Sequence, residues 1–161
     1  MSSDTVTHAE ITCLDDSSLS VTVQFNPTSF KLGRRVTWAE QNAALQPWST
    51  LQYGSGSSDT LSVTLLLDES ESDASVLPAV EGFYAFTMPL KVDSDVIRPP
   101  VLLFTWEEFR FLGVVQNLDV DVLLFDASGA PKRATVTLSL LGRAFAEAST
   151  ADEFFTQTYE P

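Results

Sequence analysis

Residues 98–140 constrain the fold of this chain most strongly, because they hold successive runs with strand character and almost no helical pattern. Residues 101–106 and 109–118 are rich in branched and aromatic side chains, and only two glutamates separate them, which predicts a tight hairpin. Apolar residues then alternate with others over 120–124 and 134–140, on either side of a turn that contains glycine and proline. We therefore expect a series of antiparallel strands here.

Strand signals also occur in the first half of the chain. Residues 6–14 and 19–25 both alternate, and the acid- and serine-rich residues 15–18 between them favour a turn, so these segments are predicted to form a hairpin. Residues 61–67 alternate in the same way and predict another strand. Residues 34–38 are a possible short strand.

The remaining segments read as loops and one helix. Residues 43–58 contain proline, glycine and several serines, which predicts a long loop, and residues 68–73 are acidic and predict an exposed loop. Apolar residues recur at three- and four-residue spacings over 74–87, which predicts the one substantial helix, with Pro78 tolerated in its first turn. The tail from residue 144 is weakly helical or irregular.

Seven or eight short strands and one helix define the expected fold class. The chain is predicted to be mainly β, either a β-barrel or two packed antiparallel sheets, with one flanking α-helix. Its 161 residues fit one domain. We place that domain at residues 1–145, followed by a C-terminal extension at residues 146–161.

The charge of the chain excludes several functions. Acids outnumber bases by 22 to 9, and a net charge of −13 argues against binding to nucleic acid or to anionic lipid. The excess acid serves solubility, or it faces a partner or a lumen that uses negative potential. No apolar run is long enough for a membrane helix, and no classical signal peptide begins the chain, so we expect synthesis in the cytoplasm and no membrane insertion.

Residues suited to catalysis are scarce. His8 is the only histidine, and Cys13, the only cysteine, lies in an alternating run where a buried hydrophobic role is expected. Glu107 and Glu108 are adjacent, so a strand would send their side chains to opposite faces. We expect no enzymatic activity and no catalytic residue.

Cofactor and metal motifs are also missing from the sequence. Residues 15–16 and 68–73 are acidic but lack the spacing of a calcium loop, and Gly54, Ser55 and Gly56 lack the lysine of a phosphate loop. No cofactor-binding or metal-binding residue is predicted. A barrel that binds a small apolar ligand stays open as an alternative, although large residues such as Phe104 and Phe111 would fill a small barrel.

Several short words of the sequence match one family in order and spacing over nearly the whole chain. They are Phe25–Ser29 with Arg35 and Trp38, Tyr53-Gly54, Leu61–Leu65 ending at Asp68, Arg98–Trp106, Phe111–Val115, Leu124–Asp126, Gly129, Pro131 and Arg133–Leu138. With these words the chain resembles the tube-protein-like hub adaptors of contractile injection systems, a LysM-associated family.

The resemblance implies a structural protein with a tail-tube-like β-barrel over residues 1–145. It implies a homohexameric ring in the baseplate hub that joins the inner tube to the spike, with the tube protein, the spike protein and other baseplate subunits as partners. A tail-tube or tube-initiator subunit of a phage-like particle is the alternative within the same machine. The particle would be assembled in the cytoplasm and could be released from the cell.

The sequence departs from the family pattern at two points. Many relatives continue into a LysM domain, whereas this chain stops at Pro161, so a peptidoglycan-binding role is not expected. Glu107 stands where relatives often have glycine. The segments 43–58 and 68–73 are predicted contact loops that become ordered on assembly.

Overall fold

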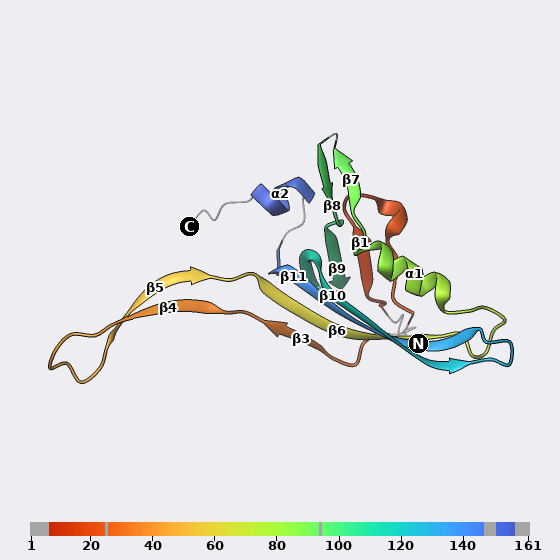
Figure 1. The fold of residues 1–161 in the computed structure, drawn as a ribbon, viewed down its shortest axis with the longest axis horizontal. Helices are drawn as coiled ribbons and strands as arrows, with labels where there is room; N and C mark the ends of the chain where they lie inside the picture. The colour runs from red at the N-terminus through yellow and green to blue at the C-terminus, as the bar shows by residue number, and fades with distance from the viewer. Residues whose placement is uncertain (1–6, 25, 94, 147–150, 157–161) are drawn as a thin grey trace, which may run out of the picture.

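The computed structural model describes residues 7–24, 26–93, 95–146 and 151–156 (Figure 1). Seven strands form one antiparallel sheet in the order β2-β1-β9-β10-β11-β6-β3. Their bounds are β1 Glu10–Cys13, β2 Val21–Thr22, β3 Phe30–Gly33, β6 Asp59–Asp68, β9 Leu102–Trp106, β10 Phe109–Phe125 and β11 Pro131–Ala144. The sheet curls into a half-barrel, so the predicted mainly β fold with a flanking helix is confirmed.

Two small hairpins and two helices complete the described structure. Strands β4 (Val36–Gln41) and β5 (Thr50–Gly56) pair only with each other, as do β7 (Leu90–Asp93) and β8 (Val96–Arg98). Helix α1 covers Leu77–Ala85 and α2 covers Ala151–Thr156, and a 3-10 turn, Ser17–Leu19, connects β1 to β2. Pro78 lies in the first turn of α1, where its missing N–H costs no helical hydrogen bond.

Alternation along the strands produces the core. The inward residues of β6 and β11 are all buried, and they pack with those of β1, β9 and β10 beneath α1. The largest fully buried side chains are Phe83, Phe86, Phe104 and Phe111. A smaller cluster on the other face joins Val101 and Leu112 to Ala151 of α2. The sheet therefore has its main core on one face and a small buried apolar cluster beside α2 on the other.

Most predicted elements are confirmed with shifted ends. The first hairpin, the strand at 61–67, the helix within 74–87 and the strands at 101–106 and 134–140 are all present. The acidic segment 68–73 is exposed loop after its first residue, which ends β6. Residues 6 and 25, at the ends of the predicted first hairpin, lie outside the described residues.

The segment 43–58 was predicted wrongly as a loop. Its residues 50–56 form β5, whose partner is the short strand expected at 34–38, found here at Val36–Gln41. Glycine and serine weaken strand propensity, but pairing across the hairpin supplies hydrogen bonds that composition does not reveal. The loop that joins the two strands covers only residues 42–49.

The expected strands 109–118 and 120–124 are one continuous strand, β10. A bulge between Val115 and Asn117 inserts an extra residue opposite β11 and reverses the alternation. In the sequence, this change in the phase of the apolar alternation resembles a boundary between two strands. Strands β3, β7 and β8 were not predicted, which raises the number of strands in the described residues above the seven or eight expected.

Candidate assembly surfaces

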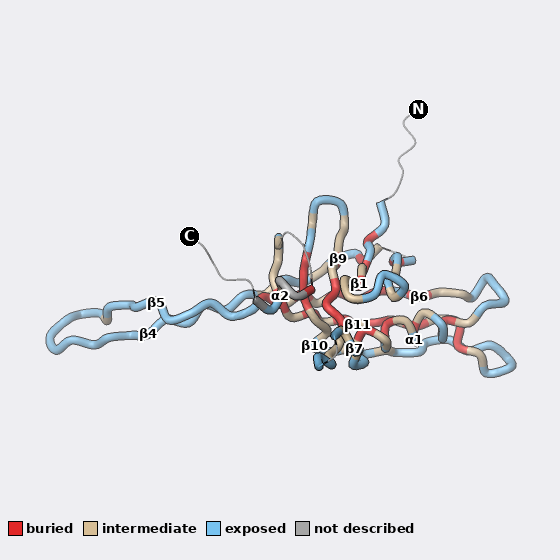
Figure 2. Tube along the Cα trace, turned by 90° about the horizontal axis from the view of Figure 1, so that it is seen from above, coloured by how far each residue is buried: buried red, intermediate tan, exposed pale blue. Residues whose placement is uncertain are grey.

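The β4–β5 hairpin, residues 36–56, projects away from the sheet, and we call it the arm (Figure 1). Every residue of both strands is exposed, as Figure 2 shows along the length of the arm. Neither strand pairs with the seven-stranded sheet. An isolated two-stranded hairpin is marginally stable in water at best. The arm therefore receives no strand support from the seven-stranded sheet of the described residues.

One face of the arm carries three large apolar side chains together with Glu40, which lies opposite Leu51, and the other face carries Gln41 and Gln52. Trp38 lies opposite Tyr53 in the ladder, their rings meet edge to face at 5.6 Å between centroids, and Leu51 lies two residues along on the same face. These three side chains are 53%, 59% and 58% exposed, in the order Trp38, Tyr53, Leu51. On the other face Gln41 donates to Gln52 Oε1 at 2.7 Å.

The base of the arm is fixed by Asp59 and carries positive charge. Buried Asp59 accepts from the N–H of Ala144 at 2.9 Å and lies 3.5 Å from Nη1 of Arg34. The backbones of Arg35 and Ser57 bond to each other across the base. Lys31, Arg34 and Arg35 are all exposed, so three of the nine basic residues of the chain lie within five positions.

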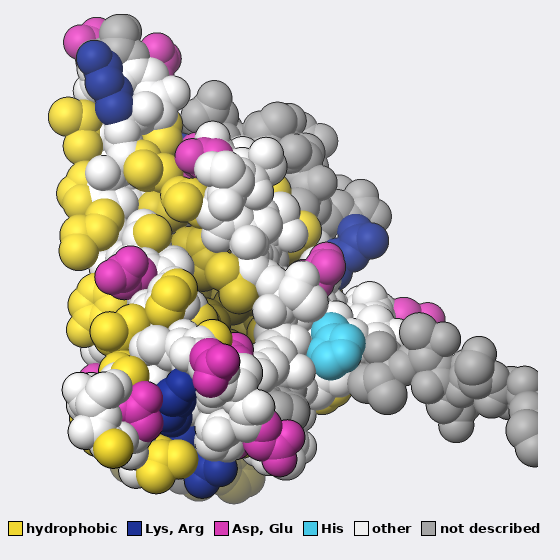
Figure 3. Space-filling view, turned by 90° about the vertical axis from the view of Figure 1, so that its right-hand side faces the viewer, with side chains coloured by type: hydrophobic (Ala, Val, Ile, Leu, Met, Phe, Trp, Pro, Cys, Tyr) yellow, Lys and Arg dark blue, Asp and Glu magenta, His cyan; other side chains and the backbone are white. Residues whose placement is uncertain are grey.

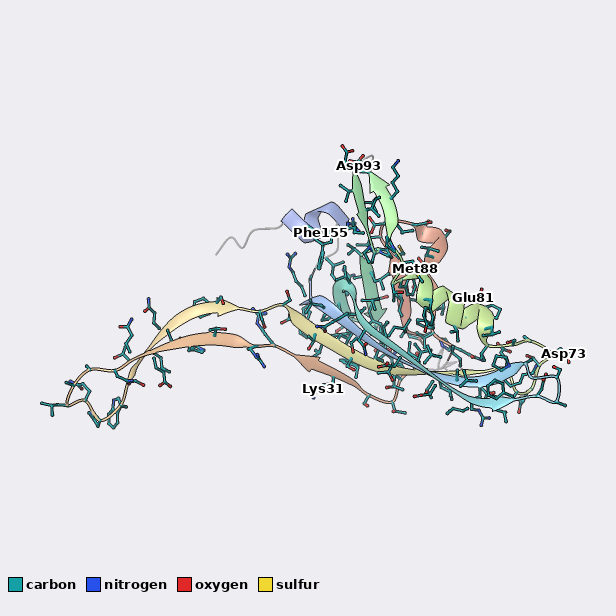
Figure 4. The ribbon with its side chains drawn as sticks, viewed as in Figure 1. Lys31, Asp73, Glu81, Met88, Asp93 and Phe155 are labelled. Carbon is teal, nitrogen blue, oxygen red and sulfur yellow. The ribbon has the colours of Figure 1, made fainter. Side chains whose placement is uncertain are left out.

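The opposite end of the molecule is apolar at its tip and acidic beside it. We call this surface, residues 66–73 and 122–126, the distal end; Figure 4 labels Asp73 there, far from the arm. The exposed apolar side chains at this end are Leu66, Val122, Leu123, Leu124 and Phe125. The loop of the distal end carries Asp68, Glu69, Glu71 and Asp73.

Lys132 holds the acidic loop, residues 68–73, against the sheet. Buried Lys132 donates from Nζ to the carbonyl oxygens of Ser72 at 3.0 Å and Ala74 at 2.6 Å. The Asp68 carboxylate lies 3.0 Å from the Arg133 guanidinium. Hydrogen bonds from Ser70 to Asp68, together with the Arg133 guanidinium, hold the pKa of the Asp68 carboxyl below its ordinary value. A hollow of about 430 Å³ lies against this loop, lined also by Gln24. The distal end is thus a shaped, negatively charged surface.

A third exposed apolar area lies on the face of α1 and β8. Its side chains are Leu77, Tyr84, Met88, Val96 and Ile97, and hydrophobic side chains gather below the β7–β8 tip along one margin of the view in Figure 3. We call these five residues the helix-side patch. It is a third surface on which a partner could pack.

The sheet face opposite the core is lined by small polar side chains. Ser62, Ser139 and Asn117 lie side by side across β6, β11 and β10, and the next row along is Thr64, Thr137 and Asp119. Thr64 and Thr137 are within 3.3 Å, oxygen to oxygen. We call these two rows the polar face.

The residues that the sequence analysis considered for catalysis or ligand binding do not lie together in the structure. His8 is exposed, with Nδ1 3.1 Å from the carbonyl oxygen of Val23. Cys13 is buried, and burial raises the pKa of its thiol, which disfavours the reactive thiolate. Glu107 and Glu108 form the exposed tip of the β9–β10 hairpin. Gly54, Ser55 and Gly56 lie in the arm.

Two structural features are absent from residues 7–24, 26–93, 95–146 and 151–156. No group of three or more His, Cys, Asp or Glu side chains in them is arranged to hold a metal ion. Neither helix within the same ranges has the length and apolar character that a membrane crossing requires. Sequence reasoning did not find the arm or the helix-side patch, because exposure of apolar residues depends on which strands remain unpartnered.

A family model described as contractile injection system tube protein matches residues 5–151. The chain belongs to this family. Members are tube-like structural parts, so a tube-like structural role follows for this chain, as the resemblance implied. No curated protein matches the chain.

Solved structures of gene transfer agent particles are similar to this tube-family chain. One is the tail of an empty particle with C6 symmetry, at 11% identity, covering 88% of this chain and 96% of that one, with a TM-score of 0.45. Another is the virion of the native particle, at 13% identity, covering 87% and 95%, with a TM-score of 0.44. At these scores the likeness adds no argument about function.

Proposed function

We propose that this chain is a structural adaptor of a contractile injection system, forming a homohexameric ring in the baseplate hub between the inner tube and the spike. The observation that carries the proposal is the family match over residues 5–151. The order of the short sequence words supports the adaptor over other tube-like parts. The alternative is a tail-tube or tube-initiator subunit of a phage-like particle.

The surfaces of the molecule fit a ring subunit. The half-barrel is open, and among the described residues its outer strands β2 and β3 each have one unpaired side that a neighbouring copy can extend. Neither described helix packs on the polar face over β6 and β11, so in a ring this face would line the lumen with serine, threonine and Asp119. In such a ring the excess of acidic side chains would suit a water-filled channel.

The partners follow from the same role. In the proposed ring one rim meets the tube protein, the other meets the spike protein, and the outside meets other baseplate subunits. Assembly takes place in the cytoplasm, and the finished particle can be released from the cell. A ligand-binding barrel is disfavoured, because Phe83, Phe86, Phe104 and Phe111 fill the apolar side of the sheet.

Co-expression with the tube protein and the spike protein of the same system tests this function. An adaptor forms single rings that bind both partners, seen by negative-stain microscopy and by co-purification. A tube subunit instead forms stacked tubes alone. A chain that stays monomeric and binds neither partner contradicts both readings.

A further inference from the structure

Helix α2 packs on the face of the sheet that lies opposite the main core. Its Ala151 is buried together with Val101 and Leu112, and Phe154 packs against the same cluster. Helix α1 instead covers the main core, and β1 and β9 stand between the two helices (Figure 1). The two helices therefore lie on opposite faces of the sheet.

Strand β11 connects the face under α2 to the polar face. The extra residue of the bulge lies in β10, so the alternation along β11 is unbroken from Thr137 to Arg143. Arg143, Ser139 and Thr137 consequently share one face, whereas Leu140 faces the main core. Arg143 pairs with Leu112 beneath α2, and Ser139 and Thr137 belong to the polar rows. Helix α2 therefore stands on the same side of the sheet as the polar face.

Two arginines from different strands hold α2 in place. Arg143 of β11 donates from Nη2 to the carbonyl oxygen of Phe154 at 2.8 Å, and its guanidinium lies 5.2 Å from the centre of that ring. Arg98 of β8 lies 4.8 Å from the centre of the Phe155 ring, and Asp15 fixes this arginine with hydrogen bonds of 2.8 and 3.0 Å. A helix of six residues is not stable alone, so these contacts decide where α2 lies.

Phe155 gives α2 an exposed apolar side chain on this side of the sheet. It is 54% exposed, whereas Phe154 beside it packs onto the sheet. Figure 4 labels Phe155 on the α2 side of β1 and β9, and Glu81 of α1 on the other side. In the proposed ring the polar face lines the lumen, so a helix that stands on this face projects inward from the wall.

We propose that α2 forms a collar inside the ring. Each copy places one α2 on the lumen side of the wall, and together these helices narrow the channel, while α1 and the helix-side patch lie on the outside. The Phe155 rings give the constriction an apolar contact that the serine and threonine rows of the polar face lack. The inference deepens the proposed function and rests on it, because the polar face lines a lumen only in a ring.

Gold labelling locates α2 in the ring directly. Full-length Phe155→Cys is labelled with a maleimide–gold cluster, mixed with an excess of unlabelled wild-type chain and assembled with the tube and spike proteins. We expect the gold in a cryo-electron microscopy reconstruction at a smaller radius than the wall. The matched control is Tyr84→Cys, which is 48% exposed in the free chain against 54% for Phe155 and should place the gold outside the wall. Wild-type chain treated in the same way should stay unlabelled, because Cys13 is buried.

Removal of α2 provides a second, independent test. A chain that ends at Ala146 should form rings with a wider lumen, in which density is lost from the inner surface alone. Full-length Phe154→Ala loosens α2 and should weaken the same density. Circular dichroism confirms that each variant is folded. The shortened chain also decides the case in which gold at position 155 prevents assembly.

The outcomes separate this inference from the proposed function. Gold outside the wall, or on its end surfaces, in the Phe155→Cys rings overturns the collar and leaves the ring function intact. An unchanged lumen in rings of the chain that ends at Ala146 also overturns it. Absence of rings from the wild-type chain co-expressed with its partners contradicts the function itself.

Discussion

Gly113 and Gly142 lie directly opposite each other in the β10–β11 ladder, at a point where the two backbones approach too closely for any side chain. A Cβ on Gly113 would lie 2.5 Å from the carbonyl oxygen of Leu141, and one on Gly142 would overlap the carbonyl oxygen of Leu112. The obstacle is backbone on both sides, so it cannot be relieved by a change of rotamer. This pair therefore sets the close packing of the two longest strands.

Gly142→Ala is expected to lower the free energy of unfolding by roughly 2–3 kcal/mol, because the added methyl group forces the strands apart. Urea denaturation followed by circular dichroism measures the change. Gly82→Ala is the control: its Cβ would meet only Val21 Cγ2 at 3.9 Å, and alanine in place of glycine within α1 should stabilise by about 0.5–1 kcal/mol. Equal effects of the two variants would contradict the steric argument.

Glu107→Gly is expected to stabilise the protein by about 1 kcal/mol. Glu107 has a φ of 53° at the first position of the two-residue turn between β9 and β10, a conformation that strains residues other than glycine. This is the position where the resemblance predicted glycine. Thermal unfolding measures the gain.

Glu108→Gly removes the same charge from the next residue, which has no positive φ. It should destabilise by a few tenths of a kcal/mol, since glycine there only increases the freedom of the unfolded chain. A gain in both variants would indicate charge relief and not backbone strain.

Asp15→Asn should cost roughly 2–3 kcal/mol at neutral pH, because it removes a charged partner of Arg98. Asp15 accepts from Arg98 at 2.8 and 3.0 Å and from the Val101 N–H at 2.8 Å. Burial by itself raises the pKa of this carboxyl, but Arg98 and the Val101 N–H lower it more, and the folded pKa lies below the ordinary 3.8.

The sign of the pH dependence follows from that lowered pKa. The carboxylate contributes its full stability above about pH 3.8 and loses it as the pH falls through the lower folded pKa. The difference in unfolding free energy between wild type and Asp15→Asn should therefore shrink only in acid. Exposed Asp121→Asn is the control, expected to change stability by under about 0.5 kcal/mol.

Phe154→Ala should release α2 from the sheet and cost about 1–2 kcal/mol. Phe154 packs against the cluster of Val101 and Leu112, and Arg143 donates to its carbonyl oxygen at 2.8 Å while lying 5.2 Å from its ring. Phe155 is 54% exposed and contacts Arg98 only through its ring at 4.8 Å, so Phe155→Ala should cost less. Hydrogen exchange at β9 and β10, faster in the first variant, reports the release.

The alternation of apolar and other residues made much of the fold predictable from the sequence. The inward rows Leu61–Leu67 and Ala134–Leu140 are buried as the period of two requires, and α1 buries Val80 and Phe83 at helical spacing. The division of the chain at residues 145 and 146 stays a prediction. For the candidate surfaces the acidic loop was recognisable from its composition, but its attachment to Lys132 was not, since 58 and 60 residues separate the bonded groups.

The sequence by itself determined a mainly β, acidic chain of the tube family, because strand periodicity, charge and short words are local properties. Only the tertiary structure decided that residues 36–56 form an unsupported arm, that β10 is one strand and that Gly113 meets Gly142. These depend on which strand pairs with which, and in what register. Every residue except proline offers the same backbone donor and acceptor, so these groups do not select a partner strand. Side-chain packing over the whole sheet decides which strands pair and in what register.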